Sequence, residues 1–556
     1  MIIAFVINIL TYLVIIGFTH LFLKHFLKKK NFSISNLDVF LGLFLLFICS
    51  SFINIFFVIS KIQYFIVIIG VYFFYDAYKK KLLRINFISI SILILVFTFI
   101  SYYSTSNIDS PMYHLQILKW LISDKAVFGL SNLEIRFGTN SSWHSIIAIL
   151  NINFIDYSSK HYLSAIIVAI GLNEVFFQKK YNNRFSFTYL NVSFIILILF
   201  SLIHPYRNGV ILNHLGNPEL DIAPMIFFIL AIYLLINFYN QKDNNNNNNN
   251  NDLFYLYCIA SFICITSRMV YAPLILPILF HYHRSTPVIK RENIFLIFAS
   301  FLWLLKSFIN SGCLIFPYKF TCMKTSWSPG IEKIDYFLKE AMSYARDTPL
   351  RAKYRNLEHT LETTDWLMPW YKQYFLPSAF LNIFALILTV SLILIFYFWI
   401  KKFWNNKKLK LFENDKLIFF ILSLSLIMWF SAPEIRLGWG VLIAFPAFIF
   451  SYSIYLNFEN ILKTNFIFKL VIIVQVLLVG LFLEKNIKYF KYKDLFVTKK
   501  KIFNYTKIKK LGVYDNFQIY VSTNWQCAEF KEFCVNKPRK NYKIREIYGY
   551  KIINGE

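Results

Sequence analysis

The chain has 556 residues, of which 57% are hydrophobic and only 16% are charged, and its mean hydropathy is +0.50. These values exclude an ordinary soluble globular protein, which would carry more charge for its length. The formal net charge of +28 suggests nucleic acid as a possible partner. The basic residues lie in short clusters between apolar runs, a pattern typical of loops retained in the cytoplasm, so we expect no nucleic acid partner. The clusters are Lys24–Lys30, Lys79–Arg84, Lys179–Arg184, Arg284–Arg291 and Lys401–Lys410.

Apolar runs recur from Ile2 to Leu483, and a helix of about 20 residues crosses the hydrocarbon core of a bilayer. Placing the basic clusters inside predicts about fourteen spans with both termini outside. We therefore expect an all-α polytopic protein of the cell (inner) membrane with extracytoplasmic (periplasmic) loops. The two runs within 253–282 are short for a bilayer, which favours bent or re-entrant helices. The predicted spans are residues 2–23, 38–59, 62–77, 85–103, 161–177, 186–203, 222–239, 253–267, 269–282, 294–312, 377–400, 417–432, 437–457 and 466–483.

The predicted spans divide the chain into three regions. Residues 1–84 supply three N-terminal helices, residues 85–483 form a transmembrane core, and residues 484–556 form an extracytoplasmic tail. Tyrosine, valine and isoleucine alternate with polar residues at 511–523, which predicts strands in a small α/β tail. The core also has three polar regions on the extracytoplasmic side, at residues 104–160, 204–221 and 313–376.

Two shorter segments call for separate predictions. The apolar run Ser142–Ile152 is too short to cross a membrane, so we expect a helix that lies at the interface. The asparagine run 244–251 cannot bury apolar area, and we interpret it as a flexible low-complexity insertion without a role in chemistry.

The cysteines test the predicted sidedness, because disulfides persist only outside the reducing cytoplasm. Three cysteines fall in predicted spans, and the other four fall in regions predicted to be outside. Short-range pairing of Cys313 with Cys322 and of Cys527 with Cys534 is the simplest arrangement, while crossed pairings and four free thiols remain open. The cysteines in spans are Cys49, Cys258 and Cys264.

The stretch Ser106–Trp120 begins where the fourth predicted span leaves the membrane on the outer side, and it contains Asp109. A carboxylate at that mouth is partly desolvated and is suited to accept a proton from a hydroxyl group, as a general base does in group transfer. Tyr113 and His114 follow on the same segment. A structural alternative remains open, in which Asp109 caps a helix that begins near Pro111.

Asp109 with Tyr113-His114-Leu115, followed by Gly138–Trp143 (GTNSSW), resembles the first outer loop of the GT-C superfamily of membrane glycosyltransferases. The resemblance is strongest to a group of uncharacterised bacterial multi-spanning proteins. These are related to the protein O-mannosyltransferases and the lipid A aminoarabinose transferases. Further matches, from residue 85 to the C-terminus, are Asn217–Asp221, Ser311-Gly312 with Phe316-Pro317, Pro433–Arg436, and Cys527 and Cys534 before Pro538.

The chain also departs from the pattern of that superfamily. The first loop often carries adjacent acids there, whereas Ser110 follows Asp109 here. This departure implies that Asp109 acts as a lone base and not as half of a metal-binding pair. Three helices precede the usual first span, as in the bacterial group.

The resemblance implies an integral membrane glycosyltransferase that moves a sugar from a polyprenyl-phosphate donor to an envelope glycan, lipid or protein. A lipid-linked donor is also expected because nucleotide sugars are absent outside the cytoplasmic membrane. Cations at the outer surface would stabilise the departing phosphate, and charges at this depth are costly unless they serve a function. The candidates are Arg436, Lys306 and Arg268. Interfacial anchoring of the arginines and snorkelling of the lysine remain open alternatives.

Glu219 and Asp221 precede the seventh predicted span, and the resemblance assigns them to an acidic second outer loop. These acids could orient the acceptor, hold a metal or cap the helix that follows. The histidines of the outer regions show no spacing such as His-x-x-x-His, so the sequence supports no metal site and no cofactor.

Three other functions remain as alternatives. A polymerase or ligase of surface polysaccharide would share the lipid-phosphate donor. A transporter or flippase would normally show internal repeats, which the sequence lacks. A non-catalytic membrane scaffold would use its outer loops as an interaction surface.

Overall fold

A computed structural model shows the fold of the chain. The predicted span 466–483 lies outside the residues that it describes except for Gly480, and so do residues 104–108 of the first polar region. The described residues are 2–103, 109–154, 157–158, 161–177, 184–202, 214–242, 247–284, 291–347, 357–404, 413–458, 480, 508–514, 517–522, 527–528, 530, 533–535 and 543–554.

The described chain is mostly helical. Its first half contains α1 (Ile2–Leu21), η1 (Phe22–Phe26), α2 (Val39–Phe56), α3 (Gln63–Lys79), α4 (Phe87–Tyr103), η3 (Ser110–His114), α5 (Leu115–Ser123), α6 (Ser142–Ile149), α7 (Leu163–Phe177), α8 (Arg184–Leu202) and α9 (Ile222–Lys242). Its second half contains α10 (Asn247–Ser267), η8 (Met269–Leu274), α11 (Ile275–Arg284), α12 (Arg291–Ser311), α13 (Ile331–Asp347), α14 (Leu357–Glu362), α15 (Leu367–Trp370), η10 (Tyr371–Phe375), α16 (Ala379–Trp404), α17 (Glu413–Phe430), η11 (Ile435–Gly438) and α18 (Trp439–Phe458). Short 3₁₀ turns lie at Ile59–Lys61, Leu130–Asn132, Ile135–Gly138 and Lys319–Thr321.

Within the described residues, 6 helices are long and apolar enough to cross a membrane, as in a multi-pass membrane protein. Other predicted spans coincide with helices whose apolar part is shorter, so the predicted number of spans is not confirmed. The six are Ile2–Phe26, Val39–Phe56, Ile222–Asn240, Arg291–Ser311, Ala379–Phe398 and Ile435–Leu456.

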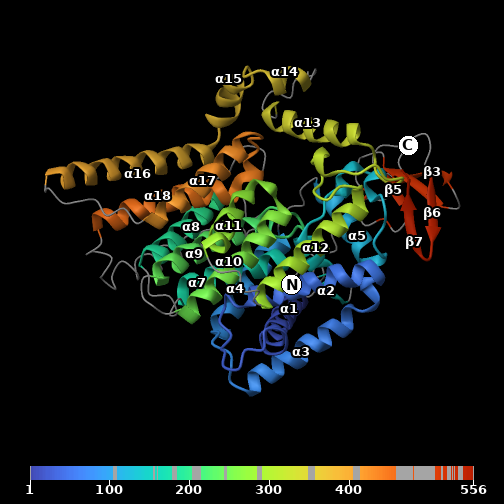
Figure 1. Ribbon diagram of the computed structural model, residues 1–556, viewed down its shortest axis with the longest axis horizontal. Helices are drawn as coiled ribbons and strands as arrows, with labels where there is room; N and C mark the ends of the chain where they lie inside the picture. The colour runs from blue at the N-terminus through green and yellow to red at the C-terminus, as the bar shows by residue number, and fades with distance from the viewer. Residues whose placement is uncertain are drawn as a thin grey trace.

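Helix α9 is the centre of the bundle, with α7, α8, α10, α17 and α18 packed around it (Figure 1). Almost every side chain of α9 is buried, which suits a helix that is apolar on all sides. The N-terminal helices α1, α2 and α3 pack on one another beside this core. Close packing of α1 on α3 depends on Gly17, since a Cβ there would lie 1.8 Å from the carbonyl oxygen of Gly70.

Two short segments differ from the predictions. Helix α6 does not lie at an interface, because all its residues are buried under α2, α5 and α10. A short apolar helix can be covered by protein as well as by lipid headgroups, and the sequence does not distinguish the two. Residues 247–251 of the asparagine run form the first turns of α10, where they continue the apolar helix that follows them.

The long loops gather at one end of the bundle, which we call the loop face (Figure 1). Of the described residues it holds 109–154, 214–221, 312–347 and 357–378. The predicted disulfides, Cys313–Cys322 and Cys527–Cys534, are confirmed and lie at this face. The remaining cysteines are free and lie in α2 and α10, as predicted.

The described tail consists of strands, so the predicted strands are confirmed there and its helical part is not seen in these residues. Strand β4 lies antiparallel to β3 and parallel to β5, while β6 and β7 form an antiparallel hairpin. Their apolar residues pack on the loop that follows Asp109. The strands are β1 (Asn153–Phe154), β2 (Tyr157–Ser158), β3 (Ile508–Tyr514), β4 (Phe517–Ser522), β5 (Phe533–Val535), β6 (Ile544–Ile547) and β7 (Tyr550–Ile553).

Candidate active site

Four charged side chains from separate parts of the sequence form one ion-pair network at the loop face. Asp109 Oδ2 pairs with Nη2 of Arg436, and Asp221 Oδ1 pairs with Nη2 of Arg268. The two pairs are joined, because Arg436 Nε lies 3.7 Å from Asp221 Oδ2. The structure thus brings together four candidate residues that the sequence offers as separate predictions.

Each member of the network lies at the end of a helix. Asp109 directly precedes η3, and Asp221 directly precedes α9. Arg268 separates α10 from η8, and Arg436 lies in η11 between α17 and α18. Because these helix ends share one face of the bundle, their side chains meet although they are far apart in sequence.

Helix capping by Asp109, interfacial anchoring by the arginines and snorkelling by Lys306 do not describe these side chains. Asp109 makes no side-chain capping bond to η3. The side chains of Arg268 and Arg436 are only 20% and 19% exposed and are paired with carboxylates, so they are not anchors in water. Lys306 is 1% exposed and does not snorkel.

Asp221 is the more deeply buried of the two acids in this network, with a side chain 1% exposed against 17% for that of Asp109. Burial alone would raise the pKa of Asp221, but the positive charges of Arg268 and Arg436 outweigh burial and hold this pKa below its usual value. Arg268 is fixed further, since its Nε donates to the carbonyl oxygen of Leu220 at 3.0 Å. Asp221 is therefore ionised at neutral pH and pairs with both arginines.

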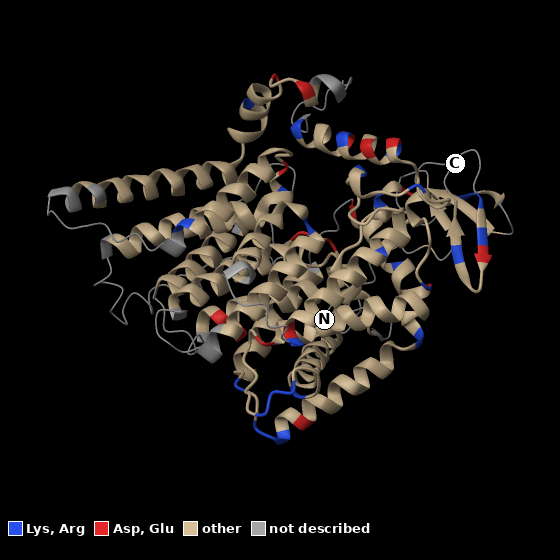
Figure 2. Ribbon diagram, viewed as in Figure 1, with Lys and Arg blue, Asp and Glu red and all other residues tan. Residues whose placement is uncertain are grey.

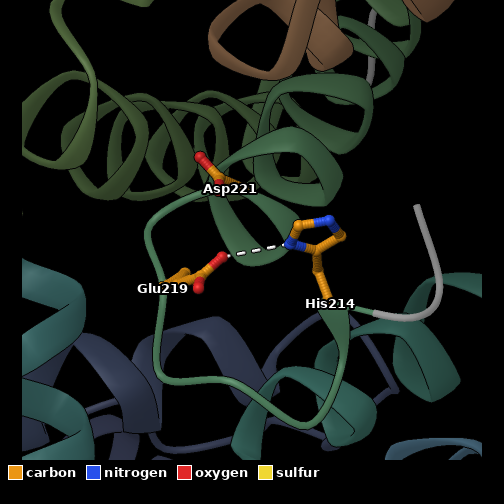
Figure 3. Close-up of side chains that lie close together, drawn as sticks. All are labelled: His214, Glu219 and Asp221. Atoms are coloured by element: carbon orange, nitrogen blue, oxygen red, sulfur yellow. Dashed lines mark hydrogen bonds and ion pairs between the residues drawn. The ribbon is translucent and has the colours of Figure 1, made fainter. Parts of the chain in front are cut away.

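Glu219 extends the network toward His214 and Ser110. Ser110 Oγ donates to Glu219 Oε1 at 2.6 Å, and 3.1 Å separates His214 Nδ1 from Glu219 Oε2. Figure 3 shows the imidazole of His214 facing the Glu219 carboxylate, with Asp221 at the start of α9. Glu219 thus links the residue after Asp109 to the second polar loop.

His214, Glu219 and Asp221 could also hold a metal ion. Each offers one ligand atom, and these atoms lie within 4.8 Å of one another and are buried. An imidazole nitrogen with two carboxylate oxygens suits divalent ions such as Mn²⁺ or Zn²⁺, with positions left for other ligands. The fit is also favourable because Asp221 Oδ2 accepts no hydrogen bond among the described residues.

The sequence prediction considered Glu219 and Asp221 as metal ligands but missed His214, because it compared histidines only with other histidines. The pattern His-x-x-x-x-Glu-x-Asp at residues 214–221 carries the signal. In the structure the donors converge because the chain turns directly before α9.

Tyr113 and His114 follow Asp109 in η3, where His114 is buried and Tyr113 is partly buried. Burial raises the pKa of Tyr113, and the negative charge of Asp109 raises it further. His114 Nδ1 lies 3.1 Å from His144 Nε2 of α6. Burial lowers the pKa of His114, and burial also lowers the pKa of His144 to about 3, so both rings are neutral at pH 7.

Lys306 of α12 lies apart from the carboxylates. Its Nζ is 3.5 Å from Ser145 Oγ of α6, and no carboxylate pairs with it among the described residues. The structure therefore places Lys306 beside α6, and among the described residues it forms no ion pair with the network of Asp109, Asp221, Arg268 and Arg436.

The turn that carries Arg436 is held by aromatic side chains. Trp370 Nε1 donates to the carbonyl oxygen of Pro433 at 3.3 Å, and Trp429 Nε1 donates to that of Glu434 at 2.8 Å. Burial raises the pKa of Glu434, and the charge of Arg436 opposes this shift.

The C-terminal tail holds the segment that carries Asp109. The Ala528 N–H donates to the carbonyl oxygen of Pro111 at 2.7 Å, and Gln116 Nε2 donates to that of Ala528 at 2.6 Å. Ala528 lies inside the loop closed by the Cys527–Cys534 disulfide. The tail is therefore a brace for the site.

A family model described as a domain of unknown function, DUF8201, matches residues 1–443, and the chain belongs to that family. No curated protein matches the sequence, and no solved structure matches it.

Proposed function

We propose that this member of the DUF8201 family is an integral membrane glycosyltransferase that uses a polyprenyl-phosphate-linked sugar. The observation that carries the proposal is the network in which a carboxylate base, Asp109, touches an arginine at the mouth of an apolar bundle. Glycosyl transfer from a lipid phosphate needs a base for the acceptor hydroxyl and a cation for the departing phosphate. Asp109 and Arg436 supply these two groups within one contact.

The reaction is a substitution at the anomeric carbon. Asp109 takes the proton of an acceptor hydroxyl, and the hydroxyl oxygen forms the new glycosidic bond. The bond between the anomeric carbon and the phosphate oxygen breaks, and its electron pair leaves with the polyprenyl phosphate. Arg436 must first leave Asp109 for the phosphate, because a carboxylate in an ion pair is a weak base. Arg268 keeps Asp221 in place during this exchange.

The charge of the site supports binding of a divalent ion near the donor. Asp109, Glu219 and Asp221 carry three negative charges, against two positive charges on Arg268 and Arg436. A donor phosphate would make the site more negative, whereas a metal held by His214, Glu219 and Asp221 would offset that charge and act as a Lewis acid on the phosphate.

The proposal also includes the side of the membrane on which the site lies. Both disulfides lie at the loop face, which supports an extracytoplasmic, periplasmic position for the site. The donor is then a lipid of the cell membrane, and the acceptor is an envelope glycan, lipid or protein.

The test is Asp109→Asn in cells that are fed radiolabelled sugars. We expect label in the envelope to fall by about 10²-fold or more and label in polyprenyl-phosphate lipids to rise, as for loss of a general base. The matched control is Asp335→Asn, which removes an acid of α13 that pairs only with Lys319 and Lys339 among the described residues. That control should retain transfer.

Other outcomes identify the alternatives. Full transfer by the Asp109→Asn variant would refute the base role. Loss of lipid transport with intact glycans would favour a flippase. Envelope glycans that contain single repeat units but no polymer would favour a polysaccharide polymerase or ligase.

A further inference from the structure

The face of the bundle opposite to the loop face carries a dense set of basic side chains. They come from the loop after α1 and from the end of α3 with its following loop. Backbone hydrogen bonds join the two loops, from Ile34 N to Leu82 O at 2.9 Å and from Arg84 N to Ile34 O at 2.8 Å. Figure 2 shows the blue segments at this end of α3 and in the loops beside it. We call Lys24, Lys28, Lys29, Lys30, Lys79, Lys80, Lys81 and Arg84 the basic patch.

Few acids neutralise the basic patch. Asp76 accepts from Lys24 at 3.0 Å and from Lys80 at 2.8 Å, and Asp252 pairs with Lys29. Among the described residues no ion pair reaches the other five members, which are all exposed. These five are Lys28, Lys30, Lys79, Lys81 and Arg84.

The backbone holds the basic patch in a defined shape. Lys28 and Lys81 have φ of +51° and +56°, which residues other than glycine rarely adopt. Each lies in one of the two loops that the backbone bonds join. In each loop this residue ends the helix before it, and the next residue bonds back into that helix, from Lys29 N to Leu23 O at 3.0 Å and from Leu82 N to Ala77 O at 3.1 Å.

The exposed side chains of α3 change from apolar to tyrosine toward the basic patch. Phe65 and Ile68 are 62% and 65% exposed, and Tyr72, Tyr75 and Tyr78 nearer the basic patch are exposed to a similar extent. Apolar side chains suit the hydrocarbon core, and tyrosines gather at the headgroup level. In a span with this order of side chains, the residues that follow, at the end of α3, would lie at the depth of lipid phosphates.

We propose that the basic patch binds the phosphate groups of anionic phospholipids in the cytoplasmic leaflet and holds α1–α3 at a fixed depth. Clusters of lysine and arginine next to a span attract anionic headgroups. The order of apolar, tyrosine and lysine side chains along α3 favours a lipid over a soluble polyanion. The proposal rests on the proposed sidedness and does not depend on the transferase activity.

The test uses the full chain, purified in neutral detergent and titrated with phosphatidylglycerol or with phosphatidylcholine, with bound lipid counted by native mass spectrometry. We expect preferential binding of phosphatidylglycerol. The variant Lys79→Gln/Lys81→Gln/Arg84→Gln should weaken that binding by on the order of 100-fold, since each charge near the surface contributes about a factor of five. Equal binding of the two lipids by the unmodified chain would overturn the proposal.

Two control variants separate a built site from general positive charge. Lys79→Arg/Lys81→Arg keeps the charge and should retain binding. Lys401→Gln/Lys402→Gln, at the end of α16, removes lysines that the sequence places on the same side of the membrane, and it should change binding little. Equal loss in this control would overturn the proposal, and so would equally tight binding of inorganic phosphate alone. Formation of the Cys313–Cys322 disulfide in each variant checks that its topology is unchanged.

Discussion

Replacing Arg268 with methionine should destabilise the folded protein by about 3 kcal/mol, at the lower end of the cost of removing one partner from a buried ion pair. The lower end applies for two reasons. Asp221 keeps Arg436 at 3.7 Å, and the Arg268 side chain is itself 20% exposed. Methionine retains most of the volume of the arginine stem, so the loss reflects charge and hydrogen bonding.

The assay is the unfolding temperature of the full chain in detergent, followed by tryptophan fluorescence. An unfolding entropy of about 2.1 cal/mol/K per residue gives about 1.2 kcal/mol/K for this chain, so the expected decrease for Arg268→Met is about 3 °C. Asp221→Asn should also lower the unfolding temperature. The decrease for the double variant should be smaller than the sum of the decreases for the two single variants. A decrease below about 1 °C, or strictly additive losses, would refute the buried pair as a source of stability.

The pH dependence checks the same pair independently. The pKa of Asp221 is lower in the folded chain than in the unfolded chain. Its stabilisation is therefore fully present above the unfolded pKa of about 4 and is lost as pH falls through the folded pKa. The difference between the natural chain and Arg268→Met should be constant near pH 7 and should shrink only in strong acid.

Three further predictions use other parts of the site. Saturating Mn²⁺ or Zn²⁺ should raise the unfolding temperature by about 2 °C, as for a ligand at 100 times its Kd, and His214→Ala should abolish this rise. The variant Cys527→Ser/Cys534→Ser should speed hydrogen–deuterium exchange near Pro111, whereas unchanged exchange would contradict the brace. The natural chain loses stability between pH 7 and pH 5, because the lowered pKa of His144 favours the unfolded chain in acid. His144→Gln should reduce this loss by about 2 kcal/mol, which unfolding scans at both pH values measure.

The sequence predicts the helices and the disulfides because their signals are local. Apolar runs locate the helices, and each disulfide joins cysteines 9 or 7 residues apart. Whether a short helix faces protein or lipid depends on tertiary packing, so the burial of α6 was not predicted. The length of a run also does not say how many helices cross a bilayer.

The sequence selects the members of the site but not their partners. Asp109, Asp221, Arg268 and Arg436 stand out because a charge beside an apolar run is costly without a role. Asp109 and Arg436 are separated by 327 residues, and no local pattern reports such a contact. His214 was missed for a different reason, since its partners are carboxylates and not histidines.

The arrangement of the loops decides which part of the site can move when a donor binds. Gly129, with φ of +70°, lies where the first loop meets the carbonyl oxygens of Trp327 and Ile553, and Asn132 Nδ2 donates to both oxygens at 2.7 and 2.8 Å. The tail also bonds to the segment directly after Asp109. Because the tail bonds to the backbone at Pro111, two residues after Asp109, the exchange from carboxylate to phosphate in the proposed transfer would fall to the long side chain of Arg436.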